Sequence, residues 1–300
     1  MRTLLSTIGL AFSLACVPFV ANAGDILDPT PVAQQSGGPA VDGVNYKLSI
    51  VGGGFDRNVL DTAGNMMFVG SVATPIPYLP PQYGAQLDLG VGIYDGDFTS
   101  AAAGLHLFWR DPSVGLLGIY GDWGYVDPEH AGRTGVEAAV YNGQWSLDIF
   151  AGIQYGQHVE TRFVDEVDVS YYFNDNLRGS IGHRLISRGH VANIAFEQML
   201  EIDGYEGVSA FGEFEAGQDS YVAAWGGFRY SFGSGNSQTL IDRDRRSDPI
   251  VRIPRNLASV TQCGNLDVVR PKTSFRSEMK NLCDDEDAIN AASSTGITKK

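Results

Sequence analysis

The sequence has little cysteine, little basic charge and no second long apolar run, and each scarcity excludes a class of protein. Its 300 residues contain three Cys, and 21 Lys and Arg against 35 Asp and Glu, for a formal net charge of −14. Such an acidic chain would repel phosphate, so a general nucleic-acid binder is excluded. Beyond residues 1–23 there is no run of about 18 apolar residues, so no transmembrane helix is expected. The chain is nevertheless 43% hydrophobic and 11% aromatic, which excludes complete disorder.

Residues 1–23 have the pattern of a cleaved export signal. A basic start precedes a mostly apolar run over residues 4–20, and Ala21-Asn22-Ala23 fits the small-x-small cleavage pattern. We therefore predict a signal peptide over residues 1–23 and a linker over residues 24–44. Two alternatives stay open. One is an uncleaved membrane anchor, for which the run is short, and the other is a lipoprotein at Cys16, whose upstream residues do not match a lipobox.

Cys263 and Cys283 are the only cysteines that remain after cleavage. Export into an oxidising compartment permits a disulfide between them. No metal site is expected, because neither cysteine is flanked by a His or by a third Cys. No cofactor is expected either, since glycine runs such as residues 52–54 lie in predicted strands and not before helices, where they would cradle phosphate.

Residues 45–232 repeat one pattern, in which about twelve stretches alternate apolar and polar residues between turn residues. Trp145 and Tyr155 bracket an aliphatic face in one stretch, and Phe163 and Phe173 do so in the next. Aromatic residues at both ends of an apolar face are typical of a strand that crosses both membrane interfaces. The pattern predicts an all-β fold, a single antiparallel transmembrane β-barrel of about 12 strands. Much of the glycine excess, 37 of 300 residues, lies within or between these strands.

The connections between the predicted strands are expected to alternate in length, as in bacterial outer-membrane barrels. The longer outer loops would lie near residues 56–65, 125–133 and 157–162. The shorter inner turns would lie near residues 111–113, 142–144 and 174–176.

The last predicted strand resembles the carboxy-terminal β-signal of outer-membrane proteins. Gly227, Tyr230 and Phe232 match its spacing, although 68 residues follow Phe232 in this chain. Residues 108–112, Phe-Trp-Arg-Asp-Pro, and the Arg-rich segment after the last strand also resemble exported barrels of Gram-negative bacteria. The resemblance covers most of the mature chain and implies a porin-like protein of the outer membrane that is inserted by the barrel-assembly machinery. It implies no enzymatic activity.

The polar faces of the predicted strands would line the lumen of the barrel. The candidates for lumen-facing charges are Asp88, Arg110, Glu137, Asp148, Glu166, Asp168, Arg178, Arg184, Glu213, Glu215 and Arg229. Seven acids against four Arg would favour cations in an open pore. The same residues could instead pair with one another and close the lumen. At twelve strands both outcomes are open, because eight-stranded barrels are filled by side chains and sixteen-stranded barrels leave a channel.

Residues 233–300 differ in composition from the barrel. They contain 11 Lys and Arg and 9 Asp and Glu, whereas residues 24–232 contain 9 and 26. Because their apolar residues show little periodicity, we expect an irregular or partly disordered periplasmic tail, with a short helix near residues 277–287. The alternative is a segment that docks on cell-wall polymer or on the acidic barrel mouth.

Two further functions compete with the narrow, cation-preferring pore or passive structural protein of the outer membrane. An outer-membrane hydrolase would use His158 with Glu160, or Glu129 with His130, on an outer loop, but no nucleophile stands at a recognisable spacing. A secreted soluble β-protein would bury its apolar strand faces against a second sheet. The expected partners are outer-membrane lipid, the barrel-assembly machinery and, through the tail, cell-wall polymer; no nucleic acid is expected.

Overall fold

The computed structural model describes residues 38–254, except for 57–61, 95, 97, 127–128, 157–158, 160, 187–188, 219–220 and 235–238. The predicted signal peptide, both mature cysteines and the predicted helix near residues 277–287 lie outside the described residues.

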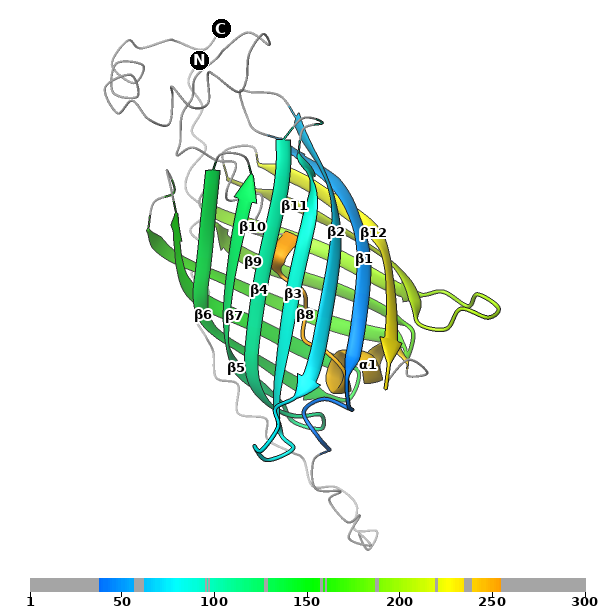
Figure 1. The fold of residues 1–300 in the computed structure, drawn as a ribbon. Coiled ribbons are helices and arrows are strands. Elements are labelled where there is room, and N and C mark those ends of the chain that lie inside the picture. Colours follow the sequence, from blue (N-terminus) through cyan, green and yellow to red (C-terminus); the bar gives the residue numbers. More distant parts are fainter. Residues whose placement is uncertain are drawn as a thin grey trace, which may run out of the picture. The chain divides into compact units, whose positions relative to one another are not determined.

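Twelve antiparallel strands form a closed barrel in which each strand pairs with its neighbours in sequence and β1 pairs with β12 (Figure 1). The predicted fold class is therefore confirmed. The strands are β1 (Asn45–Asp56), β2 (Thr62–Pro75), β3 (Tyr83–Tyr94), β4 (Phe98–Asp111), β5 (Gly115–Val126), β6 (Glu129–Asn142), β7 (Trp145–Gly156), β8 (Arg162–Asn174), β9 (Leu177–Ile186), β10 (Gly189–Met199), β11 (Val208–Gly217) and β12 (Val222–Gly233).

The alternating residues of each strand face either the lumen or the outer surface of the barrel. In β3, the side chains of Leu89 and Val91 are 54% and 62% exposed. The side chain of Asp88, which directly precedes Leu89 in the sequence, is fully buried. Successive side chains of a strand point to opposite faces, so the apolar set lies outside the barrel and the polar set inside. Among the described residues no second sheet covers these apolar faces, which contradicts the alternative of a soluble β-protein.

The strand number is even, so β1 begins and β12 ends at the same rim, which we call the inner end; the opposite rim is the outer end. The connections at the outer end are residues 57–61, 95–97, 127–128, 157–161, 187–188 and 218–221. Those at the inner end are residues 76–82, 112–114, 143–144, 175–176 and 200–207. The expectation of longer outer loops is wrong, because strands such as β5 and β6 extend into the stretch assigned to a loop near residues 125–133.

One short helix, α1 (Leu240–Arg246), follows the barrel and lies at its inner end (Figure 1). Thr239 caps it by accepting a hydrogen bond from the backbone N–H of Asp242 at 3.4 Å. Its last turn is basic, which suits the partial negative charge of a helix carboxyl end. The helix contacts the β8–β9 turn, where the Ile241 N–H donates to the carbonyl of Asp175 at 3.1 Å.

The chain then continues from α1 into the lumen, and we call residues 239–254 the plug segment. Asp248, Arg252 and Ile253 are 6%, 3% and 0% exposed. The first described part of the predicted tail therefore lies inside the barrel, which agrees better with the alternative of a docking segment than with a wholly periplasmic tail. The physical reason is charge, because Arg252 lies 2.7 Å from Glu166 inside the barrel. The carboxylates of the lumen attract this arginine-rich segment, and the local sequence of the tail does not reveal that attraction.

Candidate functional site: the lumen

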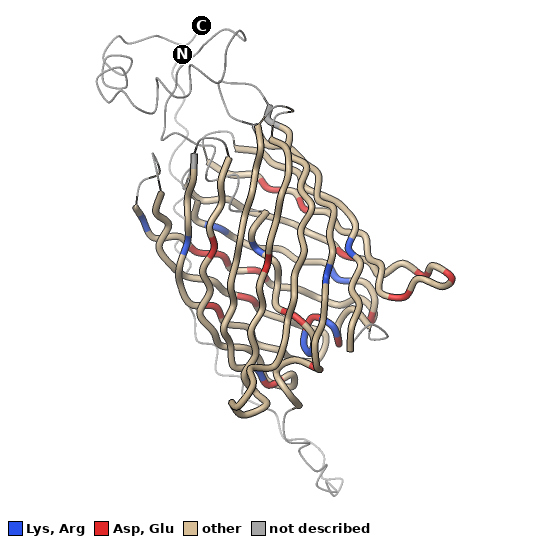
Figure 2. The backbone as a smooth tube through the Cα atoms, in the orientation of Figure 1, with Lys and Arg blue, Asp and Glu red and all other residues tan. Residues whose placement is uncertain are grey.

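All eleven charged residues predicted to face the lumen lie on the inner side of the barrel wall. Seven of them are less than 9% exposed: Asp88, Arg110, Glu137, Glu166, Asp168, Arg184 and Glu215. The other four are partly buried and line the pockets beside the plug segment: Asp148, Arg178, Glu213 and Arg229. Figure 2 shows acidic and basic positions close together around the middle of the barrel, with another group of both signs at α1.

Arg252 of the plug segment is held between acids on two strands. Its Nη1 lies 2.7 Å from Oε2 of Glu166, and its Nε lies 4.0 Å from Oε2 of Glu137. These two carboxylates compensate the charge of the buried Arg252 guanidinium.

Arg133 extends this cluster along the wall. Its guanidinium reaches Glu166 and Asp122, each at 2.6 Å, and also donates to the backbone carbonyl of Arg252 at 3.4 Å. Tyr120 donates to Asp122 at 2.8 Å. The wall and the plug segment thus share their charged groups in one continuous network.

His106 joins the other end of the network. One ring nitrogen lies 2.9 Å from a Glu137 oxygen and the other lies 3.2 Å from Oδ2 of Asp88, and the ring packs on Tyr120 with centroids 4.3 Å apart. Gln86, which donates to Asp88 at 2.9 Å, also donates to the Pro249 carbonyl of the plug segment at 3.4 Å.

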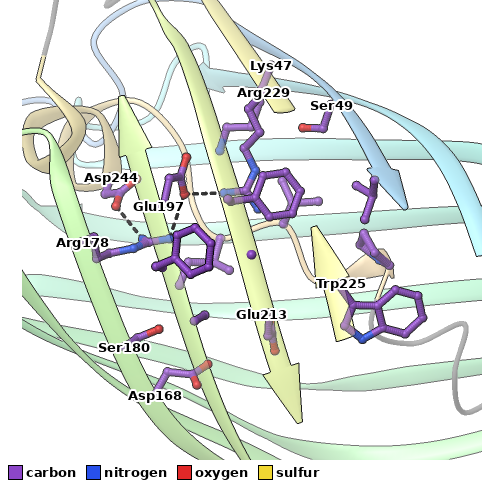
Figure 3. Close-up of a pocket in the computed structure, with 18 of the residues that line it drawn as sticks. Lys47, Ser49, Asp168, Arg178, Ser180, Glu197, Glu213, Trp225, Arg229 and Asp244 are labelled. Carbon is purple, nitrogen blue, oxygen red and sulfur yellow. Dashed lines mark hydrogen bonds and ion pairs between the residues drawn. The ribbon is translucent and has the colours of Figure 1, made fainter. Parts of the chain in front are cut away.

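A second cluster surrounds Glu197 near the inner end (Figure 3). Arg178 lies 3.0 Å from Glu197 and 2.6 Å from Asp244 of the plug segment. Arg229 also pairs with Glu197, and Arg243 of α1 reaches it at 3.4 Å. One buried carboxylate therefore connects two strands of the wall to the plug segment.

Further ion pairs and hydrogen bonds connect charged residues of the lumen. Lys47 on β1 pairs with Asp248 of the plug segment. Arg184 pairs with both Glu213 and Glu215, and Tyr221 donates to Glu215 at 2.9 Å. Unpaired buried charges are costly, so these pairings explain how so many ionisable groups can lie inside one barrel.

The free space beside the plug segment is small. A pocket of about 80 Å³ lies between the plug segment and the wall, lined by Ser49, Ser180 and Trp225 together with the Glu197 cluster (Figure 3). A second pocket, of about 20 Å³, lies next to Arg110 and Asp148. These volumes correspond to a few water molecules each.

Sequence reasoning missed several charged residues of the lumen. Lys47, Asp122, Arg133 and Glu197 all lie on inward-facing positions. Lys47 alternates with Ser49 and Val51 on β1, so a strict count of alternate positions would have found it. Arg133 falls in a predicted outer loop, and Glu197 falls in one of the least regular of the predicted strands. The plug residues carry no alternation and could not be found in this way.

The predicted hydrolase residues are not brought together in the part of the chain that the structure describes. His158, Glu160 and the side chain of Glu129 lie outside the described residues, and His130 lies near Trp123, with ring centroids 6.2 Å apart. No group of three or more His, Cys, Asp or Glu side chains suited to a metal ion occurs among the described residues.

The residues that match the β-signal lie on the strand that closes the barrel. Tyr230 and Phe232 point outward and stack on each other at 5.3 Å, and Phe232 stacks on Tyr46 of β1 at 5.2 Å. Gly227 lies where a Cβ atom would come within 1.9 Å of the Ile50 carbonyl oxygen. Closure between β12 and β1 therefore leaves no room for a side chain at this position.

The outer surface is a continuous apolar belt with aromatic rims. Trp145 and Tyr155, at the two ends of β7, are 52% and 45% exposed, and Phe163 and Phe173 of β8 are 54% and 63% exposed. So much exposed apolar surface is stable only against lipid, and the aromatic rims match the two membrane interfaces. The protein is an outer-membrane β-barrel.

Solved structures of other outer-membrane barrels are similar to this one. The KdgM porin, solved in complex with disordered oligogalacturonate, is 9% identical over 62% of this chain and 99% of that chain, with a TM-score of 0.47. An outer-membrane channel from Pseudomonas putida F1 is 8% identical over 69% and 100%, with a TM-score of 0.47. Omp33 of Acinetobacter baumannii is 7% identical over 63% and 98%, with a TM-score of 0.42.

No protein-family model and no curated protein matches the sequence. The likeness to the solved barrels concerns the fold alone.

Proposed function

We propose that this outer-membrane barrel is a closed channel, whose lumen conducts only when the plug segment leaves it. The observation that carries this proposal is Arg252, which is 3% exposed and lies against Glu166 and Glu137 in the middle of the lumen. A lumen that Arg252 bridges, with a pocket of about 80 Å³ beside it, would obstruct the passage of a hydrated solute.

The open lumen would be narrow and would prefer cations. The buried charged residues of the strands include seven carboxylates and four Lys or Arg: Asp88, Asp122, Glu137, Glu166, Asp168, Glu197 and Glu215 against Lys47, Arg110, Arg133 and Arg184. The buried charges of the plug segment are Arg243, Asp248 and Arg252, a net charge of +1, so its departure would increase the acidic excess by one. An acidic pore wall attracts cations.

Planar-bilayer recording of the full chain tests the proposal. Arg252→Glu places a third carboxylate beside Glu137 and Glu166, and disrupting such a buried pair costs about 3–5 kcal/mol, or about a hundredfold or more in the open population. We expect a nearly silent wild-type protein and a cation-selective conductance from Arg252→Glu.

Arg246→Glu is the matched control, because Arg246 is a half-exposed residue of α1 paired only loosely with Asp242, at 3.5 Å. It should remain as silent as the wild type. If Arg252→Glu folds, as shown by heat-modifiable gel migration, and still does not conduct, the channel proposal is wrong and a passive structural protein is the better account. A large steady conductance from the wild type would also contradict it.

A further inference from the structure

Three polar side chains interrupt the apolar belt on the lipid-facing side of the wall. They are Asp165 of β8, His183 of β9 and His190 of β10, and these strands are consecutive neighbours in the barrel (Figure 1). Each stands next in sequence to a buried inward residue, so each faces outward. Polar groups on a lipid-facing surface are destabilising, most strongly at the middle of the bilayer. The cluster therefore needs a polar environment at its own level.

The cluster lies close to the outer end of the barrel. Asp165 is the fourth residue of β8 and His190 is the second residue of β10, and both strands begin at the outer end. His183 is the fourth residue from the outer end of β9. Phe163, a residue of the aromatic rim, is one outward position beyond Asp165. The cluster thus lies at the level of the outer membrane interface, where the lipid headgroups are.

The three side chains are hydrogen-bonded in series. Nδ1 of His183 lies 3.2 Å from Oδ1 of Asp165, and Nε2 of His183 lies 2.8 Å from Nδ1 of His190. The two rings are inclined by 36°, with centroids 5.1 Å apart. Both nitrogens of His183 are therefore used. In the described part of the chain, Nε2 of His190 has no hydrogen-bond partner.

The backbone around the β9–β10 connection holds the last ring in place. Gly189 has a φ of +102°, which glycine adopts more readily than other residues, and an added Cβ there would clash with Oε1 of Gln218. The same oxygen accepts a hydrogen bond from the backbone N–H of His190 at 2.9 Å. A side chain of the β11–β12 connection thus fixes the start of β10, and with it the position of His190 beside His183.

The charge of the cluster determines which atom it presents to the outside. With both imidazoles neutral, the carboxylate of Asp165 would leave a net negative charge against lipid, which is costly. One added proton makes the cluster neutral, with a carboxylate beside an imidazolium. His183 then donates on both sides, to Asp165 and to His190, so the hydrogen of His190 is on Nε2. The exposed end of the series is therefore an N–H donor and not a base.

The other outward positions around the cluster are uncharged. The cross-strand partners of His183 are Val167 and Ala192, and Leu185 lies between the other two members of the cluster. These apolar neighbours offer no acceptor to the N–H of His190. The acceptor that suits this donor belongs to the headgroup layer.

From this geometry we propose that Asp165, His183 and His190 form a binding site for the phosphate group of a lipid in the outer leaflet. The Nε2–H of His190 donates to a phosphate oxygen, and the imidazolium strengthens that hydrogen bond through its positive charge. Asp165 is a positioning residue, because it orients His183 and compensates its charge from the side away from the ligand. The inference concerns the outer wall, so it is independent of the channel proposal.

Native mass spectrometry of the full chain in detergent tests the proposal, because it counts bound lipid molecules. The probes are bisphosphorylated lipid A, the same lipid without phosphate, and inorganic phosphate. We expect the wild type to retain the phosphorylated lipid. His190→Phe, whose ring suits a lipid-facing position, should bind it at least about tenfold more weakly. Heat-modifiable gel migration confirms folding, and His190→Ala replaces a His190→Phe protein that fails to fold.

His130→Phe is the matched control. His130 is also an outward histidine near the outer end of its strand, the second residue of β6, and its ring lies beside Trp123. This variant should bind the phosphorylated lipid as the wild type does.

Asp165→Asn tests the positioning role through the pH profile of binding. It leaves the imidazolium without a carboxylate, so binding should require a lower pH than in the wild type, within the range of about pH 5 to 8 in which imidazole gains its proton. A purely structural role of Asp165 would reduce the amount of folded protein and leave the pH profile of binding where it is.

Three results would overturn the proposal. The first is equal binding of the phosphorylated lipid by the wild type and the His190 variant. The second is equal binding of lipid A with and without phosphate. The third is displacement of the lipid by an equal concentration of inorganic phosphate, which would show a site for the free ion and not for a lipid.

Discussion

At the scale of single residues, the lumen depends on arginines that each serve more than one carboxylate. Arg184 pairs with Glu213 and Glu215, and Arg133 pairs with Asp122 and Glu166. The planar guanidinium suits this role, because it presents several donors at once and keeps its charge when buried. The reverse also occurs at Glu197, where one carboxylate serves three arginines.

Glu197→Gln tests this arrangement. It leaves Arg178, Arg229 and Arg243 around a neutral amide, so we expect the free energy of unfolding to fall by about 3–5 kcal/mol. Denaturant unfolding of the refolded protein in detergent measures it. Asp242→Asn, at an exposed position of α1, should cost at most about 1 kcal/mol. Equal effects of the two substitutions would show that the Glu197 cluster adds no stability.

At the scale of elements, the junction between β1 and β12 decides whether the barrel closes. The two strands pair from Asn45 with Gly233 to Phe55 with Ala223, and they are the most distant strands in the sequence. Pairing of such distant segments comes late and costs more chain entropy than pairing of neighbours. Close packing at the junction therefore has a large effect on assembly.

Gly227→Val should prevent closure, because its Cβ would meet the Ile50 carbonyl oxygen at 1.9 Å. We expect loss of the fast-migrating folded form after refolding in detergent, a condition that removes any effect on recognition by the assembly machinery. Gly52→Ala on the partner strand is the control, since no atom lies within 4 Å of its added Cβ. Normal folding of Gly227→Val would contradict the assigned register.

The strands can be predicted from the sequence, but the plug segment cannot. Lipid favours apolar residues on the outward face, so β3 and β7 carry a regular two-residue pattern that the amino-acid order alone displays. Asp248 and Arg252 have no such local requirement, because their partners Lys47 and Glu166 come together only when the barrel closes. The loop predicted near residues 125–133 is wrong for a related reason: inward residues such as Arg133 are polar, so the end of β6 looks like a loop.

At the scale of the whole molecule, the apolar belt and the closed barrel predict how the protein behaves in extracts. It should stay with the outer-membrane fraction after carbonate washing, because the outward faces of all the strands are covered by lipid. It should also migrate faster on a gel before heating than after, because a closed barrel with paired strands stays compact in detergent. Release into the soluble fraction by carbonate would be inconsistent with the membrane assignment.

The short outer connections affect how the barrel can be recognised from outside the cell. The longest of them, residues 57–61 and 157–161, join strands that run almost to the rim. Such a rim offers antibodies and bacteriophages little surface to bind, since most recognition of outer-membrane barrels from outside depends on protruding loops. The inward charges of the wall could then change without altering the surface that a host or a virus contacts.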